Sequence, residues 1–252
     1  MIPYERRKQI LDTLERQEFV NLDDFCSILG DVSLSTIRRD LCLLETEGKI
    51  VLLRGGAARM KSRSYDAPLS SRKELRVKEK ESIAKIAAGL VKDGEVIYLD
   101  AGSTVLRMVK HLRNKKITVV TTNATIMPEV VDVGFKCIFV AGELLKETGS
   151  LVGPLTDNLL KSMYFDKAFI GATGYDLQAG INTPDEREAS KKVIVKNNTK
   201  ETFVLVDSSK EEIKSLSKCF DLDECVIITE KETPLLKKHA KYLAASTIEG
   251  RL

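Results

Sequence analysis

The chain has 252 residues, of which 43% are hydrophobic and 31% charged, an ordinary globular balance that can form one large domain or two modest ones. The formal net charge of +3 is too small to indicate a nucleic-acid partner by itself, so charge has to be examined locally. No apolar run approaches the roughly 20 residues needed to span a bilayer, and the charged N-terminus lacks a signal-peptide core, which predicts a soluble cytoplasmic protein without membrane partners.

The first sixty residues have the pattern of short helices followed by a hairpin. An apolar stripe of Ile10, Leu11 and Leu14 indicates the first helix. The elements expected after it are a helix over residues 22–29 capped by Asn21, a helix between the cap Ser33 and the stop Gly48, a strand over 49–53 and a turn at Gly55-Gly56. This order predicts a winged helix-turn-helix, which we assign to residues 1–58.

The rest of the chain predicts a linker followed by an α/β domain. Residues 59–74 are basic and contain several serines, which is typical of a linker, and a helix is expected from about Leu75 to Val91. Short apolar runs that indicate buried strands follow at residues 96–99, 117–120, 137–140, 168–170, 203–206 and 226–228. Helical stretches lie between several of them, as at Val105 to Leu112 and Glu186 to Lys196. The alternation predicts a mostly parallel sheet covered by helices over residues 75–252.

The third helix carries the features of a DNA-reading helix. Small hydroxyl residues at its start can contact phosphates and base edges, arginines one turn later can reach guanine or the backbone, and apolar residues anchor the opposite face. The candidate DNA contacts are Ser33, Ser35, Thr36, Arg38, Arg39, Lys49 and Arg54. A solvated amphipathic helix with incidental arginines is the alternative. Ten basic and ten acidic residues cancel over residues 1–61, so binding requires positive charge concentrated on one face.

The amino-acid sequence of this region resembles that of a known family. Ser35 to Leu41, followed by Leu44-Glu45, Gly48 and Gly55-Gly56-Ala57, is similar to the signature of the DeoR (deoxyribose-operon-repressor) family. The resemblance implies a domain that binds operator DNA, usually to repress a sugar-utilisation operon.

Polar loops follow several of the expected strands. Because ligands bind outside the carboxyl ends of the strands of an open α/β sheet, these loops predict one site, although each alone can be an ordinary turn. Glycine in Asp100-Ala101-Gly102-Ser103-Thr104 allows close approach to a ligand, and Lys210 can supply a cation for a phosphate. The candidate effector-binding residues are Asp100, Gly102, Ser103, Thr104, Asn123, Gly171, Glu186 and Lys210.

The family resemblance extends over the second domain. Residues 100–104, 166–171 and 207–210, together with Glu188-Ala189, fit the DeoR sensor domain. That resemblance implies a fold similar to ribose-phosphate isomerases and recognition of a phosphorylated sugar. It predicts a repressor of a sugar or sugar-phosphate catabolic operon, without catalytic residues. The five cysteines form no CxxC or Cys/His cluster, so reduced thiols are expected, and no cofactor or metal is expected either.

Two further points concern function class and assembly. The alternative function is a sugar-phosphate isomerase-like enzyme with an appended DNA-binding domain, in which Asp185, Glu186 and Glu188 could act as bases. These acids also suit the N-terminus of a helix that begins near Pro184. A homo-oligomer, at least a dimer, is expected because paired recognition helices match palindromic half-sites.

Overall fold

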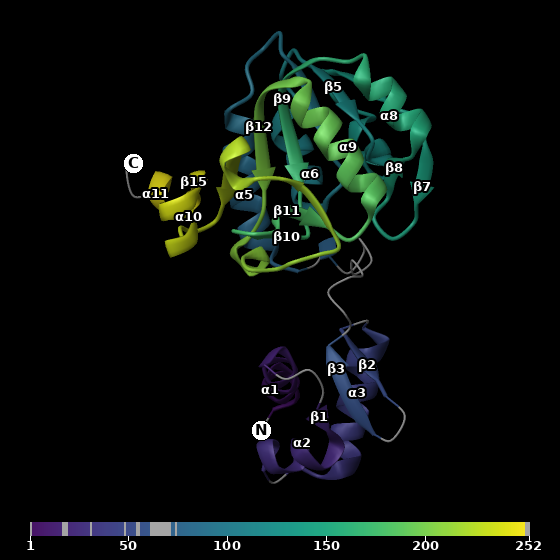
Figure 1. Cartoon of the computed structure of the whole chain (residues 1–252), viewed down its shortest axis with the longest axis vertical. Coiled ribbons are helices and arrows are strands. Elements are labelled where there is room, and N and C mark those ends of the chain that lie inside the picture. The colour runs from purple at the N-terminus through teal and green to yellow at the C-terminus, as the bar shows by residue number, and fades with distance from the viewer. Residues whose placement is uncertain are drawn as a thin grey trace. The chain divides into compact units, whose positions relative to one another are not determined.

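The computed structural model describes residues 2–16, 20–30, 32–47, 49–53, 56–60, 72–73 and 75–249. The chain divides into two compact units, Met1–Ala67 and Pro68–Leu252, called here the N-terminal unit and the C-terminal unit (Figure 1).

The N-terminal unit packs helices around a small antiparallel sheet. Its described elements are α1 (Pro3–Arg16), β1 (Val20–Asn21), α2 (Leu22–Leu29), α3 (Leu34–Thr46), β2 (Ile50–Leu52) and β3 (Ala57–Met60), and the strand order is β1-β3-β2. Apolar side chains that recur every three or four residues bury one face of each helix, including Ile10 of α1, Phe25 of α2 and Ile37 of α3. The expected helices and hairpin are confirmed, whereas β1 was not expected. Gly48, Arg54 and Gly55 lie outside the described residues.

The C-terminal unit is built on a parallel sheet. Within residues 75–249 its seven strands are β4 (Val96–Leu99), β5 (Thr118–Thr121), β6 (Lys136–Phe139), β9 (Phe165–Gly171), β12 (Thr199–Leu205), β14 (Val226–Thr229) and β15 (Lys241–Ala244). They lie in the order β15-β14-β12-β9-β4-β5-β6, and every neighbouring pair is parallel. The expected α/β class with a mostly parallel sheet is therefore confirmed.

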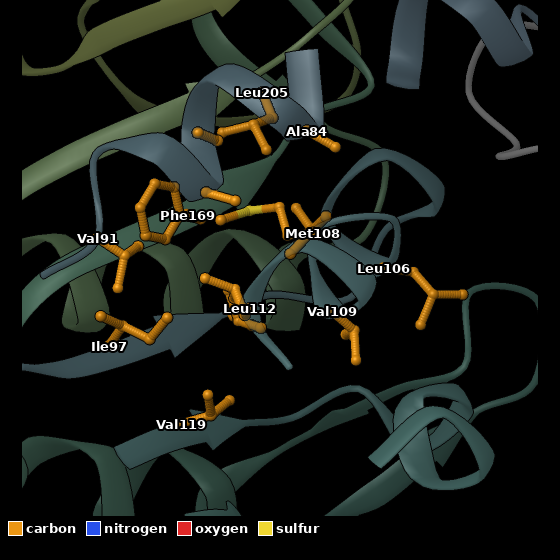
Figure 2. Packing of buried hydrophobic residues seen from close by; sticks show 14 of the residues in the cluster. Ala84, Val91, Ile97, Leu106, Met108, Val109, Leu112, Val119, Phe169 and Leu205 are labelled. Atoms are coloured by element: carbon orange, nitrogen blue, oxygen red, sulfur yellow. The ribbon is translucent and has the colours of Figure 1, made fainter. Parts of the chain in front are cut away.

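Two apolar layers cover this sheet. The first joins strand residues to α5 (Val77–Gly89), α6 (Ser103–Leu106) and α7 (Val109–Leu112). Figure 2 shows part of it, with Met108 and Leu112 near Phe169 of β9. The second contains buried residues of α8 (Pro154–Lys161), α9 (Glu186–Asn197) and α10 (Pro234–His239). The short helix α11 (Ala245–Glu249) follows β15.

Smaller elements that the sequence did not predict surround the sheet. They are the hairpin of β7 (Glu143–Leu145) and β8 (Ser150–Val152), the antiparallel β10 (Gly174–Asp176), β11 (Gly180–Thr183) and β13 (Ser217–Phe220), and the 3₁₀ turns η1 (Ala124–Val130), η2 (Ser208–Lys210) and η3 (Leu222–Glu224). The single helix expected over residues 105–112 is two short helices, because Arg107 and Met108 form tighter i to i−3 hydrogen bonds between them. No helix in the described part of the chain is long and apolar enough to cross a bilayer.

Candidate functional site

Hydroxyl groups cluster at the exposed start of α3. Ser33 caps the helix by accepting a hydrogen bond from the backbone N–H of Thr36 at 3.3 Å. Its Oγ lies 3.0 Å from the Oγ of Ser35 and 2.9 Å from the Oγ1 of Thr36. Ser33 and Ser35 are exposed and Thr36 is half-buried. The three predicted contact hydroxyls therefore lie together at the end of the helix that would meet a phosphate or a base edge.

The two faces of α3 differ in charge and burial. Ile37 and Leu41 are buried in the core of the unit, while Arg38 and Arg39 are exposed. Asp40 is buried and forms an ion pair with the guanidinium of Arg6 on α1. Since Asp40 is neutralised inside the unit, the exposed middle of α3 is positive even though the unit as a whole has balanced charge.

Two of the predicted DNA contacts, Lys49 and Arg54, lie outside α3. The ammonium of Lys49 lies 2.6 Å from the carboxylate of Glu47, so part of its charge is already compensated. Arg54 lies outside the described residues. Glu45 has a structural role, because its Oε1 accepts a hydrogen bond from the backbone N–H of Leu52 at 2.8 Å and joins α3 to the hairpin.

In the C-terminal unit the strand order reverses between β4 and β9. The chain runs outward from β4 through β5 and β6, and then resumes on the other side with β9, β12, β14 and β15. Such a switch point leaves a crevice beyond the strand ends, where ligands of α/β proteins bind. Asp100 follows β4 and Gly171 ends β9, so both flank this point, and the N–H of Gly171 donates to Oδ2 of Asp100 at 3.3 Å.

Asp100 is fully buried and binds two lysines of α9. Its Oδ2 accepts a hydrogen bond from the ammonium of Lys192, and its Oδ1 lies 3.3 Å from the ammonium of Lys191. Burial alone would raise the pKa of Asp100, but Lys192 and Lys191 outweigh it and lower that pKa below its ordinary value. The cluster holds Asp100 as a carboxylate at neutral pH. Neither lysine was predicted from the sequence.

Two further groups extend this polar cluster. The hydroxyl of Tyr98 lies 2.6 Å from that of Thr122 and donates to Asp100 at 3.4 Å. Glu188 is buried, and its two oxygens accept hydrogen bonds from Thr148 at 3.0 Å and Thr183 at 3.1 Å. The contacts of Asp100 and Tyr98 thus join the loops after β4 and β5 to α9, and those of Glu188 join α9 to β11 and to the turn between β7 and β8.

Asn123 contributes a buried donor to the same edge of the sheet. Its Oδ1 accepts hydrogen bonds from the backbone N–H and the hydroxyl of Thr125, at 2.9 and 2.7 Å. Its Nδ2 is buried and has no hydrogen-bond partner among the described residues. A buried polar group without a partner costs free energy, so this amide is a strong candidate for a ligand contact.

The loop after β4 also borders a cavity. Ser103 and Thr104 are buried, and a Cβ added to Gly171 would lie 3.5 Å from the carbonyl oxygen of Ala101, so the loops after β4 and β9 are in close contact. A cavity of about 220 Å³ is lined by Lys73, Ser103, Leu106, Arg107, Lys110 and Glu129. The predicted loop of residues 100–104 therefore borders both the switch point and an open space.

Lys210 is the last residue of η2 and lies near a second group of charged residues, which contains Asp207, Lys80 and Arg76. The 3₁₀ turn holds it near Asp207, whose carbonyl accepts the backbone N–H of Lys210 at 3.0 Å. The charges of Lys210 and Asp207 both act on Lys80 of α5, and Arg76 approaches Asp207 at 3.6 Å. Lys80 was not predicted, because in the sequence it belongs to an ordinary basic stretch.

Not every predicted effector residue has an equally suitable position. Asp100, Gly102, Ser103, Thr104 and Asn123 border the switch point or the polar network. Glu186 instead is exposed in the first turn of α9. Asp185 caps that helix by accepting the N–H groups of Arg187 at 2.9 Å and Glu188 at 3.3 Å, which supports the structural interpretation of these acids. Among the described residues there is no group of three or more His, Cys, Asp or Glu that could hold a metal ion.

Comparison with known proteins covers both units. Residues 6–63 match the model of the DeoR-like helix-turn-helix domain, and residues 75–231 match that of the DeoR C terminal sensor domain. The chain is 32% identical to an uncharacterized HTH-type transcriptional regulator, FruR, of Bacillus subtilis, over 91% of each chain. It is 32% identical to the lactose phosphotransferase system repressor of Lactococcus lactis, over 81% of this chain and 82% of that one. Among solved structures, a ribose 5-phosphate isomerase A of Methanocaldococcus jannaschii aligns with a TM-score of 0.39 and 24% identity, over 52% of this chain and 53% of that one.

Proposed function

Because the chain belongs to the DeoR family of transcriptional regulators, we propose that it is a repressor of an operon for sugar use that responds to a phosphorylated sugar. The N-terminal unit binds operator DNA through α3, and the C-terminal unit binds the effector at the switch point between β4 and β9. A protein that binds a bacterial operator acts in the cytoplasm. The relatives support the class of function, since one of them is named the lactose phosphotransferase system repressor.

The single observation that carries the effector site is the buried amide of Asn123. Its Nδ2 has no partner among the described residues, and it belongs to the same sheet edge as Ser103, Thr104 and Lys210. Sugar hydroxyls accept hydrogen bonds from such a group, and a phosphate accepts them from hydroxyls and a lysine. A phosphorylated sugar therefore matches the available donors better than a neutral apolar ligand.

The same geometry argues for binding without turnover. An isomerase needs a carboxylate base free to reach a carbon-bound proton. Both oxygens of Glu188 accept hydrogen bonds from threonines, and Asp185 caps α9. Asp176, the last residue of β10, accepts the backbone N–H groups of Gln178 and Ala179 at 2.8 and 3.0 Å. Glu186, the third of the acids named above, is exposed in the first turn of α9. The other acids are occupied by structural hydrogen bonds, which favours a sensor that leaves its effector intact.

The proposal includes a homo-oligomer of at least two chains. One recognition helix contacts only a few base pairs, and two-fold related helices can occupy half-sites about one turn of DNA apart.

Replacing Arg38 or Arg39 by alanine should weaken operator binding by roughly 1–3 kcal/mol and relax its sequence preference. Both arginines are exposed beside the hydroxyl cluster of α3, while neighbouring Ile37 anchors the helix. Fluorescence-anisotropy titration of the full chain with operator DNA at fixed salt measures the effect. Lys8→Ala removes the same charge from an exposed position on α1 and should change affinity less and without change in preference. Normal operator affinity in both arginine variants, with folding intact, would contradict the assignment of α3.

Replacing Lys210 by alanine should weaken binding of the sugar phosphate at least about tenfold, since a charge-assisted hydrogen bond to phosphate is lost. A thermal-shift screen of the full chain against sugar phosphates identifies the ligand, and calorimetry measures its affinity. Lys238→Ala, at an exposed position on α10, is the matched control and should bind normally. Equal affinity of both variants would remove Lys210 from the site. Protein-dependent conversion of the ligand, followed by NMR, would instead favour an isomerase.

A further inference from the structure

The segment Arg72-Lys73, called here the connector, is held by two cationic side chains of the C-terminal unit. Lys80 of α5 donates a hydrogen bond from its ammonium to the carbonyl oxygen of Arg72. Arg107, which directly follows α6, donates from Nη2 to the carbonyl oxygen of Lys73 at 2.8 Å. In chain order, the connector is the first described segment after residues 61–71, and the N-terminal unit precedes them.

Lys80 also lies near Asp207 and Lys210, which follow β12 at the edge of the sheet that carries the proposed effector site. Its side chain is buried, and it is in electrostatic range of Lys210, Asp207 and Arg107. Burial, reinforced by Lys210, Arg107 and Arg72 and opposed by Asp207, lowers the pKa of Lys80 to about 8. Its ammonium is therefore poorly compensated where it stands, and a phosphate would compensate it better than a carbonyl does.

Arg107 has spare hydrogen-bonding capacity in the same place. Its Nε is buried and has no hydrogen-bond partner in the described parts of the chain. The side chain lines the 220 Å³ cavity together with Ser103 and Lys73. The carboxylate of Glu81 lies 3.8 Å from its guanidinium, but Lys110 and His111 approach Glu81 more closely, each at 2.7 Å. Arg107 can thus accept a further anionic partner inside the cavity.

We propose that Lys80 and Arg107 exchange partners: they hold the connector when the site is empty, and they bind the phosphate of the effector when it is occupied. The inference rests on the proposed function, because it requires a phosphorylated effector. A phosphate adds the attraction between opposite charges, and for Arg107 a bidentate geometry, that a neutral carbonyl oxygen does not offer, and this difference drives the exchange. A ligand can alter DNA binding only if it interacts differently with two states, and the freed connector supplies the second state.

The test follows the connector and the phosphate together in the full chain. Hydrogen exchange of the amides of residues 72–80 is measured by mass spectrometry with and without inorganic phosphate, and phosphate affinity is measured by calorimetry. In the wild type, phosphate should speed exchange several-fold. Arg107→Gln should show the faster exchange without phosphate, show no further increase with it, and bind phosphate at least about tenfold more weakly. Lys85→Gln, at an exposed position on α5, should behave as wild type.

Three outcomes would overturn the inference. Normal phosphate affinity in Arg107→Gln would remove the residue from the site. Binding of phosphate by the wild type without a change at residues 72–80 would refute the exchange and leave the proposed function intact. Failure of the wild type to bind phosphate or any sugar phosphate, with operator binding retained, would refute the proposed effector and the inference together. If Arg107→Gln does not fold, Lys80→Gln replaces it, with the same expected results.

Discussion

Replacing Asp100 by asparagine should lower the free energy of unfolding of the C-terminal unit by about 3–5 kcal/mol, the range for removing one partner of a buried ion pair. Asp100 is fully buried, and so are the two lysines that it binds, Lys191 and Lys192. The asparagine keeps the shape of the side chain but leaves both ammonium groups without this counter-charge. Urea unfolding of the full chain measures the loss, and hydrogen exchange of β4 and β9 assigns it to this unit.

Two controls separate the effect of charge from that of shape. Lys192→Met in the Asp100→Asn background removes one uncompensated ammonium, so the double variant should recover part of the lost stability. The destabilisation of Asp100→Asn should also shrink as pH rises. In the wild type, burial lowers the pKa of Lys192, and Asp100 more than offsets this, so the variant without the carboxylate should favour the neutral form of this buried amine. The unfolded state then binds more protons than the folded state, and stability should increase toward the ordinary lysine pKa near 10.4. A loss that does not change with pH would point to packing instead.

At acidic pH, the stability of the wild type depends on the protonation of Asp100. The pKa of Asp100 is lowered in the folded state, so the stability that it contributes is present above its ordinary pKa and is lost as pH falls through the lowered value. Asp100→Asn should therefore be less sensitive to acid than the wild type over that range.

Six of the seven strands described in the parallel sheet of the C-terminal unit were predictable because they contain short apolar runs between polar loops, whereas β15 at its edge was not expected. The expected strand over residues 96–99 has the observed bounds, and the expected helix at Glu186 to Lys196 corresponds to α9. The β7–β8 hairpin and the β10-β11-β13 sheet escaped prediction. Their strands have three or four residues, and some contain glycine or asparagine, as in Gly180–Thr183, so no alternation of apolar and polar residues marks them.

The candidate site was predictable only where its residues stand in loops at strand ends. Asp100 and Asn123 were found in this way, because the ends of parallel strands meet at one edge. Lys191 and Lys192 could not be found, because two adjacent lysines within a helix indicate a solvated face. Only the packing of α9 over the sheet buries them. Glu186 was a candidate effector contact, but it is exposed, and the buried acid at the start of α9 is Glu188.

The N-terminal unit contains a similar buried charge pair, and its sequence also gave no sign of it. Arg6 was one of three consecutive basic residues beside the apolar stripe of α1, and Asp40 directly follows the two exposed arginines of α3. In the structure, both side chains turn inward and join α1 to α3. The pair therefore fixes the helix that carries Arg38 and Arg39 and removes an acidic charge from their surface.

Replacing Asp40 by alanine should lower the free energy of unfolding of the N-terminal unit by about 3 kcal/mol, because it leaves Arg6 buried without this carboxylate. The expected loss is at the lower end of the range for buried pairs, since the side chains keep exposures of 11% for Arg6 and 7% for Asp40. A unit of this size is only marginally stable, so such a loss is a large share of the total. Operator affinity should fall with it, although Asp40 itself points away from the reading face.

The Arg6→Met and Asp40→Leu variants, alone and together, complete the test. Each single change removes one charge of the pair and leaves the other without this counter-charge, whereas the double change replaces the pair by apolar side chains that can pack between α1 and α3. Stability and operator affinity should therefore both fall in each single variant and recover in the double variant. Recovery of stability without recovery of operator affinity would show that one of these side chains contributes to DNA binding directly. Full stability in both single variants would mean that solvent already screens the pair and that the apolar core alone holds α3 in place.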